Sequence, residues 1–179
     1  MITVYTIGHA SHDKEKFIEM LKAHGIKLLI DVRTIPKSRK VPQFNWDVLE
    51  EHLRKHKILY VYMPQLGILR HFSKDSLNTG WRNLSFRGFA DYMQTEEFWN
   101  GIEDLMIHAA GKKTAIMCAE ALPWRCHRSL IADALLSKGA KVFHIISPTN
   151  LLEHKMTKFA KVMNGRITYP AQSYKSVKA

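Results

Sequence analysis

The segment that most constrains the fold of this chain is residues 114–128, TAIMCAEALPWRCHR. Its first six residues are mostly apolar, which is typical of a strand buried on both faces of a parallel sheet. Pro123 suits the start of a helix, and the apolar residues that follow predict that this helix continues to a C-terminal cap at Gly139. The predicted first helical turn contains four chemically active residues: Arg125, Cys126, His127 and Arg128.

The rest of the chain alternates strand-like and helix-like segments. Apolar runs predict strands at 2–7, 27–32, 59–63, 114–119 and 141–146. Helical spacing predicts helices between them, and a last helix that buries Leu152, Met156, Phe159 and Met163. Such alternation indicates a three-layer, Rossmann-like α/β fold: a mainly parallel five-stranded sheet with helices on both faces. We expect one domain over residues 1–165, followed by a polar, basic tail over 166–179.

Several reactive side chains lie in the last residues of predicted strands or just after them. The carboxyl ends of parallel strands meet at one edge of the sheet, which is where open α/β sheets bind ligands. We therefore expect these side chains to converge there, together with the Cys-His-Arg turn: His9, Asp31, Arg33, Cys118 and Glu120.

Arginines are the strongest functional signal at this edge. Guanidinium groups match phosphate geometry, and a helix N-terminus also favours anions. Five arginines are candidates for an anion-binding site: Arg33, Arg39, Arg70, Arg125 and Arg128. The alternative is that each arginine pairs with a nearby acid and only holds a loop in place. A buried ion pair between Arg33 and Glu120 is one such arrangement.

Candidate catalytic groups accompany the arginines. Glu120 and Asp31 are candidates for acid–base chemistry, with His9 and His127 as alternatives near neutral pH. Cys118 is a candidate nucleophile, because arginine and a helix N-terminus favour a thiolate. However, Arg125 lies one residue further from Cys118 than a cysteine-phosphatase loop requires, and a buried cysteine is often only a small hydrophobic residue.

Metal binding is a weaker alternative. Cys118, Cys126 and His127 could ligate zinc, but their spacing matches no common zinc motif and a fourth ligand must come from elsewhere. We therefore predict no metal and no required cofactor. Trp124 could stack on a base or ring, although aromatic side chains are more often packed.

Composition points to a phosphate-bearing small molecule or nucleic acid as the partner. The 179 residues carry a formal net charge of +11, and they include no apolar stretch long enough to cross a bilayer. Two cysteines are too few for a disulfide framework, so we expect free thiols and a cytoplasmic protein. The sequence does not indicate an oligomeric state.

Four motifs between Tyr5 and Ile145 resemble the family known as domain of unknown function 488. They are YTIGHA, DVRTIPKSRKVPQF, WRNLSFRGFADYMQTEEF and MCAEALPWRCHR, the last followed by HI. Ala10 and Ile68 depart from the family pattern, where serine and a second glycine are usual. The resemblance implies the fold and the site but no reaction.

Three functions fit these observations. The first is an enzyme that acts on a phosphorylated or nucleotide-like substrate at the carboxyl edge of the sheet. The second is a nucleic-acid-binding module without turnover, and the third is a zinc-stabilised interaction domain. The sequence favours the first.

Overall fold

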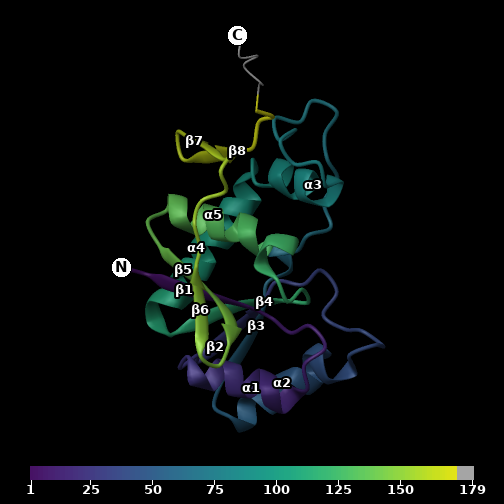
Figure 1. The fold of residues 1–179 in the computed structure, drawn as a ribbon, viewed down its shortest axis with the longest axis vertical. Helices are drawn as coiled ribbons and strands as arrows, with labels where there is room; N and C mark the ends of the chain where they lie inside the picture. The colour runs from purple at the N-terminus through teal and green to yellow at the C-terminus, as the bar shows by residue number, and fades with distance from the viewer. Residues whose placement is uncertain (173–179) are drawn as a thin grey trace, which may run out of the picture.

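The computed structural model describes residues 1–172 and contains one main sheet (Figure 1). Its strand order is β3-β2-β4-β1-β5-β6. The first five strands are parallel: β1 (Thr3–Gly8), β2 (Leu28–Asp31), β3 (Leu59–Tyr62), β4 (Thr114–Cys118) and β5 (Lys141–Ser147). The edge strand β6 (Asn150–Glu153) is antiparallel to β5. The predicted α/β class with a mainly parallel sheet is confirmed, but the sheet has six strands rather than five.

Helices cover both faces of this sheet, and each face has its own apolar core. Helices α1 (Lys14–Ala23) and α2 (Trp46–Lys55) pack on one face through side chains such as Phe17 and Leu49. Helices α3 (Leu84–Tyr92), α4 (Glu96–Gly111) and α5 (Arg128–Ser137) cover the other. In Figure 1 the first pair lies below the sheet and the other three helices above it. The prediction of helices on both faces is correct.

The ends of the three central strands lie level with one another. Gly8 at the end of β1 pairs with Cys118 at the end of β4, and Asp31 at the end of β2 pairs with Met117. The loops after β1, β2 and β4 therefore leave the sheet side by side. This is the convergence that the sequence predicts.

The loop after β4 folds back over the end of β1, and Gly8 makes this possible. A Cβ atom at position 8 would lie only 1.6 Å from the main-chain oxygen of Glu120. The backbone amide of Ala10 also donates to the oxygen of Ala119 at 2.8 Å. The close approach of the two backbones at Gly8 thus fixes the position of the loop after β4.

The predicted helix from Pro123 to Gly139 is broken near its start. A short 3-10 turn, η3 (Pro123–Arg125), is followed by extended backbone at Cys126, with φ −135° and ψ 149°, and α5 begins only at Arg128. Cys126 and His127 therefore precede the helix instead of lying in its first turn. The extended backbone at Cys126 ends the proline-initiated turn.

The predicted last helix is wrong. Residues 150–153 form β6, which returns along β5 after a tight turn at Pro148 and Thr149. The strands β7 (Lys161–Met163) and β8 (Arg166–Thr168) then form a hairpin. Leu152 and Met163 are exposed, so the helical spacing of apolar residues does not correspond to a buried face.

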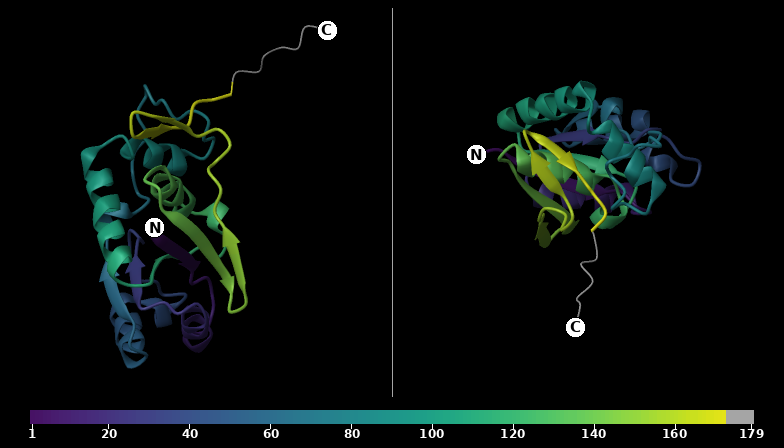
Figure 2. Two further views of the ribbon diagram at one scale, coloured as in Figure 1. Left: turned by 90° about the vertical axis from the view of Figure 1, so that its left-hand side faces the viewer. Right: turned by 90° about the horizontal axis from the view of Figure 1, so that it is seen from above.

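The expected tail from residue 166 is also wrong as far as the described residues extend. Ile167 and Tyr169 are fully buried, and the hairpin lies beside α3 at the end of the molecule opposite α1 and α2 (Figure 2). Gln94, just after α3, donates to the oxygen of Ile167 at 2.7 Å. The folded domain therefore continues beyond 165, while residues 173–179 lie outside the described part. None of the helices in residues 1–172 is long and apolar enough to cross a membrane.

Candidate functional site

A cavity of about 440 Å³, here called the strand-end pocket, lies at the carboxyl ends of β2 and β4. The segment after β2 contributes Arg33 and Thr34, and the end of β4 with the two residues after it contributes Cys118 to Glu120. The turn before α5 adds Arg125 to His127, and residues around the start of α3 close the remaining side. The chain leaves β2 for a helix on one face and β4 for a helix on the other, so this crevice is a topological switch point.

Arg33 is the most rigidly held basic group in this pocket. Its Nε and Nη2 atoms donate to the carboxylate of Asp31 at 2.7–3.2 Å, and its backbone amide donates to the same group at 3.0 Å. The hydroxyl of Tyr60 donates to Asp31 at 2.6 Å. Asp31 is fully buried, and these hydrogen bonds occupy both oxygens of its carboxylate. The carboxylate therefore orients Arg33 and is poorly placed for acid–base chemistry.

His9 supports the same arginine from the other side. Its Nδ1 donates to the oxygen of Ala10 at 2.8 Å, which leaves Nε2 to accept from Arg33 at 3.4 Å. The ring stacks on Phe44, with centroids 4.5 Å apart. Burial lowers the pKa of His9 from 6.5 to about 4, so the imidazole is neutral near pH 7. His9 therefore positions Arg33 and does not itself line the pocket.

The two cysteines are paired, and among residues 1–172 there is no free cysteine. The two thiols expected from the sequence lie together in this structure, because the extended backbone at Cys126 brings its sulfur to that of Cys118. Cys126 also accepts a hydrogen bond from the backbone amide of Arg128 at 3.4 Å. Both cysteines line the strand-end pocket, so this pair is part of its wall.

His127 is held in one tautomer beside the cysteine pair. Its Nε2 lies 3.1 Å from the oxygen of Val32 and 2.9 Å from that of Leu66, and two carbonyl acceptors require a proton on Nε2. Its Nδ1 is then an acceptor, 3.5 Å from the sulfur of Cys126. Burial lowers the pKa of His127 to about 4, so the ring is a weak base.

Arg128 is fully buried and faces away from the strand-end pocket. Its Nη2 donates to the oxygens of Glu120 and Ala121 at 2.6 and 3.4 Å, and its Nη1 donates to Thr6 at 3.1 Å. Burial lowers the pKa of Arg128 to about 10, which still leaves it protonated near pH 7. Within residues 1–172 it forms no ion pair with a carboxylate, so its contacts fit a role in holding the β4–α5 loop.

Glu120 and Arg125 are the exposed charged groups of the strand-end pocket. Within the described chain, the carboxylate of Glu120 has no hydrogen-bond or ion-pair partner. The sequence alternative of an Arg33–Glu120 ion pair is wrong, because Arg33 pairs with Asp31. Glu120 and Arg125 are thus free to contact a ligand.

The remaining candidates lie elsewhere. Arg39 is exposed on the loop after β2 and does not line the strand-end pocket. Arg70 packs on the ring of Tyr92 at 3.7 Å and donates to backbone oxygens of the segment before it. Trp124 is 57% exposed and lines a different cavity.

The N-terminus of α5 is a further possible anion site. Its first backbone amides already donate hydrogen bonds within the protein. The helix dipole would therefore attract an anion, but few free N–H groups remain to bind it.

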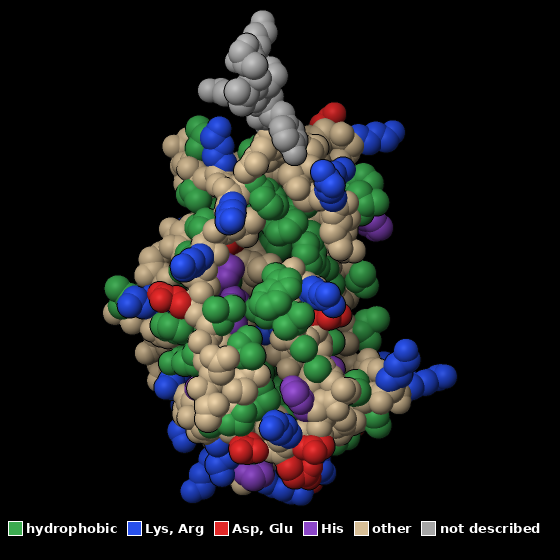
Figure 3. Space-filling model, in the orientation of Figure 1, with side chains coloured by type: hydrophobic (Ala, Val, Ile, Leu, Met, Phe, Trp, Pro, Cys, Tyr) green, Lys and Arg blue, Asp and Glu red, His purple; other side chains and the backbone are tan. Residues whose placement is uncertain are grey.

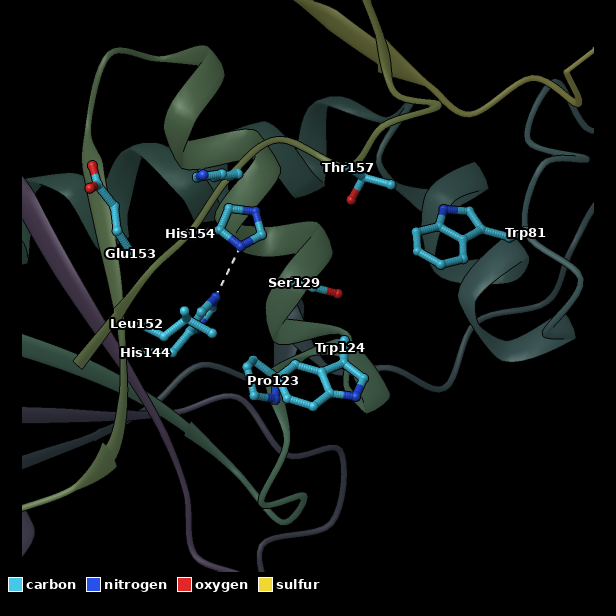
Figure 4. Close-up of a pocket in the computed structure, with 10 residues that line it drawn as sticks. Trp81, Pro123, Trp124, Ser129, His144, Leu152, Glu153, His154 and Thr157 are labelled. Carbon is cyan, nitrogen blue, oxygen red and sulfur yellow. Dashed lines mark hydrogen bonds between the residues drawn. The ribbon is translucent and has the colours of Figure 1, made fainter. Parts of the chain in front are cut away.

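That different cavity, here called the histidine pocket, has a volume of about 480 Å³ and lies beside α5, β5 and the segment after β6. Figure 4 shows the imidazoles of His144 and His154 joined by a hydrogen bond, with Trp124 near them and Trp81 further along the pocket. Sequence reasoning missed both histidines as site residues. The only signal for His144 was the HI pair in the family resemblance.

Hydrogen bonds through this pocket run in one direction. Arg128 donates to Thr6, Thr6 lies 2.6 Å from Nδ1 of His144, and Nε2 of His144 lies 2.9 Å from Nδ1 of His154. Nε2 of His154 reaches the buried carboxylate of Asp133 at 2.8 Å. Arginine can only donate a hydrogen bond and a carboxylate can only accept one, so the donor of each bond in this series is fixed. Every ring nitrogen of His144 and His154 takes part in one of these bonds.

Asp133 also joins the C-terminal segment to α5. It accepts from the backbone amide of Thr157 at 3.0 Å and from the hydroxyl of Tyr169 at 2.8 Å. Burial raises the pKa of Tyr169 well above 10, so this hydroxyl remains a donor. The histidine chain therefore fixes the segment after β6 on α5 and leaves no ring nitrogen free for a ligand.

Metal-ligand geometry is a further test of the site. Within residues 1–172, no group of three or more histidine, cysteine or acidic side chains is arranged to hold a metal ion. Pairing of Cys118 with Cys126 also takes both sulfurs out of the proposed zinc ligand set.

Comparison with known proteins identifies a family but no activity. No curated protein and no solved structure matches the chain. A family profile described as "Domain of unknown function DUF488" matches residues 13–135. The match covers most of the chain and includes the segments after β2 and β4 that line the strand-end pocket. The chain therefore belongs to the DUF488 family, a domain family of unknown function.

Proposed function

We propose that this protein is an enzyme that acts on a small phosphorylated or nucleotide-like substrate in the strand-end pocket. Arg33 and Arg125 contact the phosphate, and Glu120 orients water or accepts its proton. One observation carries the proposal: a preorganised arginine, an exposed arginine and an unpaired carboxylate line the same pocket. Its volume of about 440 Å³ lies within the range of small-molecule sites.

The charge around the pocket supports an anionic ligand. Among the residues that line the pocket, Arg33 and Arg125 carry positive charge and Glu120 carries negative charge, which leaves an excess of one positive charge. The buried carboxylate of Asp31 partly offsets the charge of Arg33. Arg33 meets a ligand at low conformational cost because Asp31 and His9 already fix its side chain.

The other predicted residues take supporting roles in this proposal. Asp31 and His9 position Arg33, and Arg128 holds the loop that carries Glu120. Arg39 and Arg70 do not contact the substrate. Cys118 is a nucleophile only after the cysteine pair has been reduced, since a paired sulfur cannot attack a substrate.

The test is a thermal-shift screen of the reduced protein with phosphate, sulfate, nucleotides, dinucleotides and short oligonucleotides at two salt concentrations. A ligand that binds only the folded state raises the melting temperature by mass action. The proposal expects a salt-tolerant shift with a small phosphate compound, which Arg125→Ala reduces and Arg39→Ala does not. No shift with any small anion would contradict it.

A nucleic-acid-binding module without turnover is the second candidate. Lys155, Lys158 and Lys161 are exposed on the segment after β6, as a phosphate-binding surface would require. The face seen in Figure 3, however, has its lysines and arginines dispersed over the surface and not gathered in one stripe. A shift with oligonucleotides alone that disappears at higher salt and on charge reversal of these lysines would favour this function.

A further inference from the structure

We propose that Cys118 and Cys126 form a reversible dithiol–disulfide pair that exchanges with low-molecular-weight disulfides entering the strand-end pocket. This activity goes beyond the proposed substrate chemistry and does not depend on it. It rests on the contact between the two sulfurs, on their position in the pocket wall and on the different surroundings of each sulfur.

Access to the pair is through the pocket. Both cysteines are only 4% exposed, yet both line the strand-end pocket. A small disulfide can therefore reach the sulfurs from the cavity, whereas a folded protein cannot place its own disulfide there. The reaction partner is accordingly a small molecule.

Cys126 has the surroundings of an attacking thiolate. Its sulfur accepts the backbone amide of Arg128 at 3.4 Å, directly before the N-terminus of α5. Both the hydrogen bond and the helix dipole stabilise negative charge on this sulfur. Nδ1 of His127, with its proton held on Nε2, lies 3.5 Å away; it is too weak a base to take the thiol proton, and it accepts a hydrogen bond only from the protonated thiol.

Cys118 has the surroundings of the second, resolving thiol. It ends strand β4, and its sulfur lies 3.9 Å from the main-chain oxygen of Glu120. A carbonyl oxygen accepts from a thiol but repels a thiolate, so this contact favours the protonated form. The two sulfurs therefore differ in reactivity although they touch.

The exchange proceeds in two balanced steps. The thiolate of Cys126 attacks one sulfur of the small disulfide, forms a mixed disulfide and releases one small thiolate. Cys118 then loses its proton and attacks the sulfur of Cys126, which forms the Cys118–Cys126 bond and releases the second small thiolate. Overall, one dithiol and one disulfide become one disulfide and two thiols.

The chain between the cysteines carries Glu120 and Arg125, so oxidation acts on the loop that lines the pocket. The oxidised pair closes this loop, and the reduced pair releases it. Exchange with a small disulfide thus changes the same pocket wall that the proposed substrate contacts.

The test traps the mixed disulfide. Reduced Cys118→Ser and Cys126→Ser variants, checked for folding by circular dichroism, are incubated with oxidised glutathione and followed by intact mass. Cys118→Ser should accumulate the mixed disulfide at least about threefold faster than Cys126→Ser, because the gain in thiolate at Cys126 outweighs its lower nucleophilicity. Equal rates, or faster reaction of Cys126→Ser, would overturn the assignment.

Two controls establish the route and the reversibility. Arg125→Ala should slow reaction with the anionic glutathione disulfide but not with neutral bis(2-hydroxyethyl) disulfide, and Arg39→Ala should change neither rate. In the native wild-type protein, dithiothreitol should reduce the pair and oxidised glutathione should restore it. If reduction occurs only after the chain is unfolded, the pair is a structural disulfide and the proposal fails. If exchange occurs without any phosphate-dependent thermal shift, only the proposed enzymatic function fails.

Discussion

The Nη2 atom of Arg128 donates to the main-chain oxygen of Glu120 at 2.6 Å, which joins the start of α5 to the loop after β4. Through Nη1 the same guanidinium contacts Thr6 on β1, and its backbone amide contacts the sulfur of Cys126. One buried side chain thus connects the strand-end pocket to the histidine pocket. Its charge is satisfied chiefly by neutral oxygen acceptors.

Arg128→Ala should destabilise the folded protein by about 3–5 kcal/mol, because the substitution creates a cavity and leaves buried oxygens without a donor. Arg125→Ala, in the same loop but exposed, should change stability by no more than about 0.5 kcal/mol. Urea unfolding of both variants measures the difference. Comparable stabilities for the two would show that the Arg128 contacts do not hold the loop.

Gly8→Ala should cost at least about 2 kcal/mol, since its Cβ would overlap the oxygen of Glu120 and displace the loop. Gly111→Ala is the matched control: nothing lies within 4 Å of the added atom at the end of α4. That substitution should be neutral or stabilising by up to about 1 kcal/mol. Thermal unfolding of the pair measures both effects, and a well-tolerated Gly8→Ala would refute the close approach.

Stability should fall as the pH is lowered from about 6.5 toward 4. Burial lowers the folded-state pKa of His9 and His127 to about 4 and that of His144 to about 3. The unfolded chain therefore binds more protons in this window, and the stability present above pH 6.5 is lost on acidification. One such group contributes about 3 kcal/mol.

Urea unfolding across this pH range measures the slope for wild type and for His127→Gln. The variant should show a shallower slope because it lacks one buried titrating ring. His71→Gln, at an exposed position, is the matched control. An unchanged slope in His127→Gln would mean that this ring does not titrate as its burial requires.

Reduction of the Cys118–Cys126 pair should lower the free energy of unfolding by about 2–3 kcal/mol, as expected for a short closed loop. Guanidinium unfolding with and without a thiol reductant measures this difference. The double variant Cys118→Ser/Cys126→Ser should be insensitive to the reductant. If the reductant still lowers the stability of the double variant, the effect does not come from the Cys118–Cys126 pair and the prediction fails.

Local sequence patterns predicted the strands that build the site. Apolar runs located β1 to β5, and the rule that parallel strands end at one edge placed Arg33, Glu120 and Cys118 together. This prediction needed only the spacing of apolar residues along the chain and the rule that strands joined by crossover helices run parallel. The order of the strands required contacts between distant segments.

The errors arose where tertiary contacts overrode local spacing. The apolar residues of 150–163 have helical spacing. However, strand pairing with β5 and the hydrogen bond between His154 and Asp133 hold the first part of this segment in extended backbone. The histidine chain joins Thr6 to His144, 138 residues away, and continues through His154 to Asp133, and these residues share no motif. The burial of Arg128 could not be predicted from the sequence either. The local sequence Cys-His-Arg does not indicate whether the arginine contacts a ligand or a main-chain carbonyl.

Calorimetric titration of the reduced protein with inorganic phosphate and adenosine monophosphate, for wild type, Arg125→Ala and Arg39→Ala, tests the central claim most directly. The account predicts saturable binding by wild type, a loss of about tenfold in affinity for Arg125→Ala, and no change beyond about twofold for Arg39→Ala. Absence of binding to wild type, or equal losses in the two variants, would contradict an anion site in the strand-end pocket.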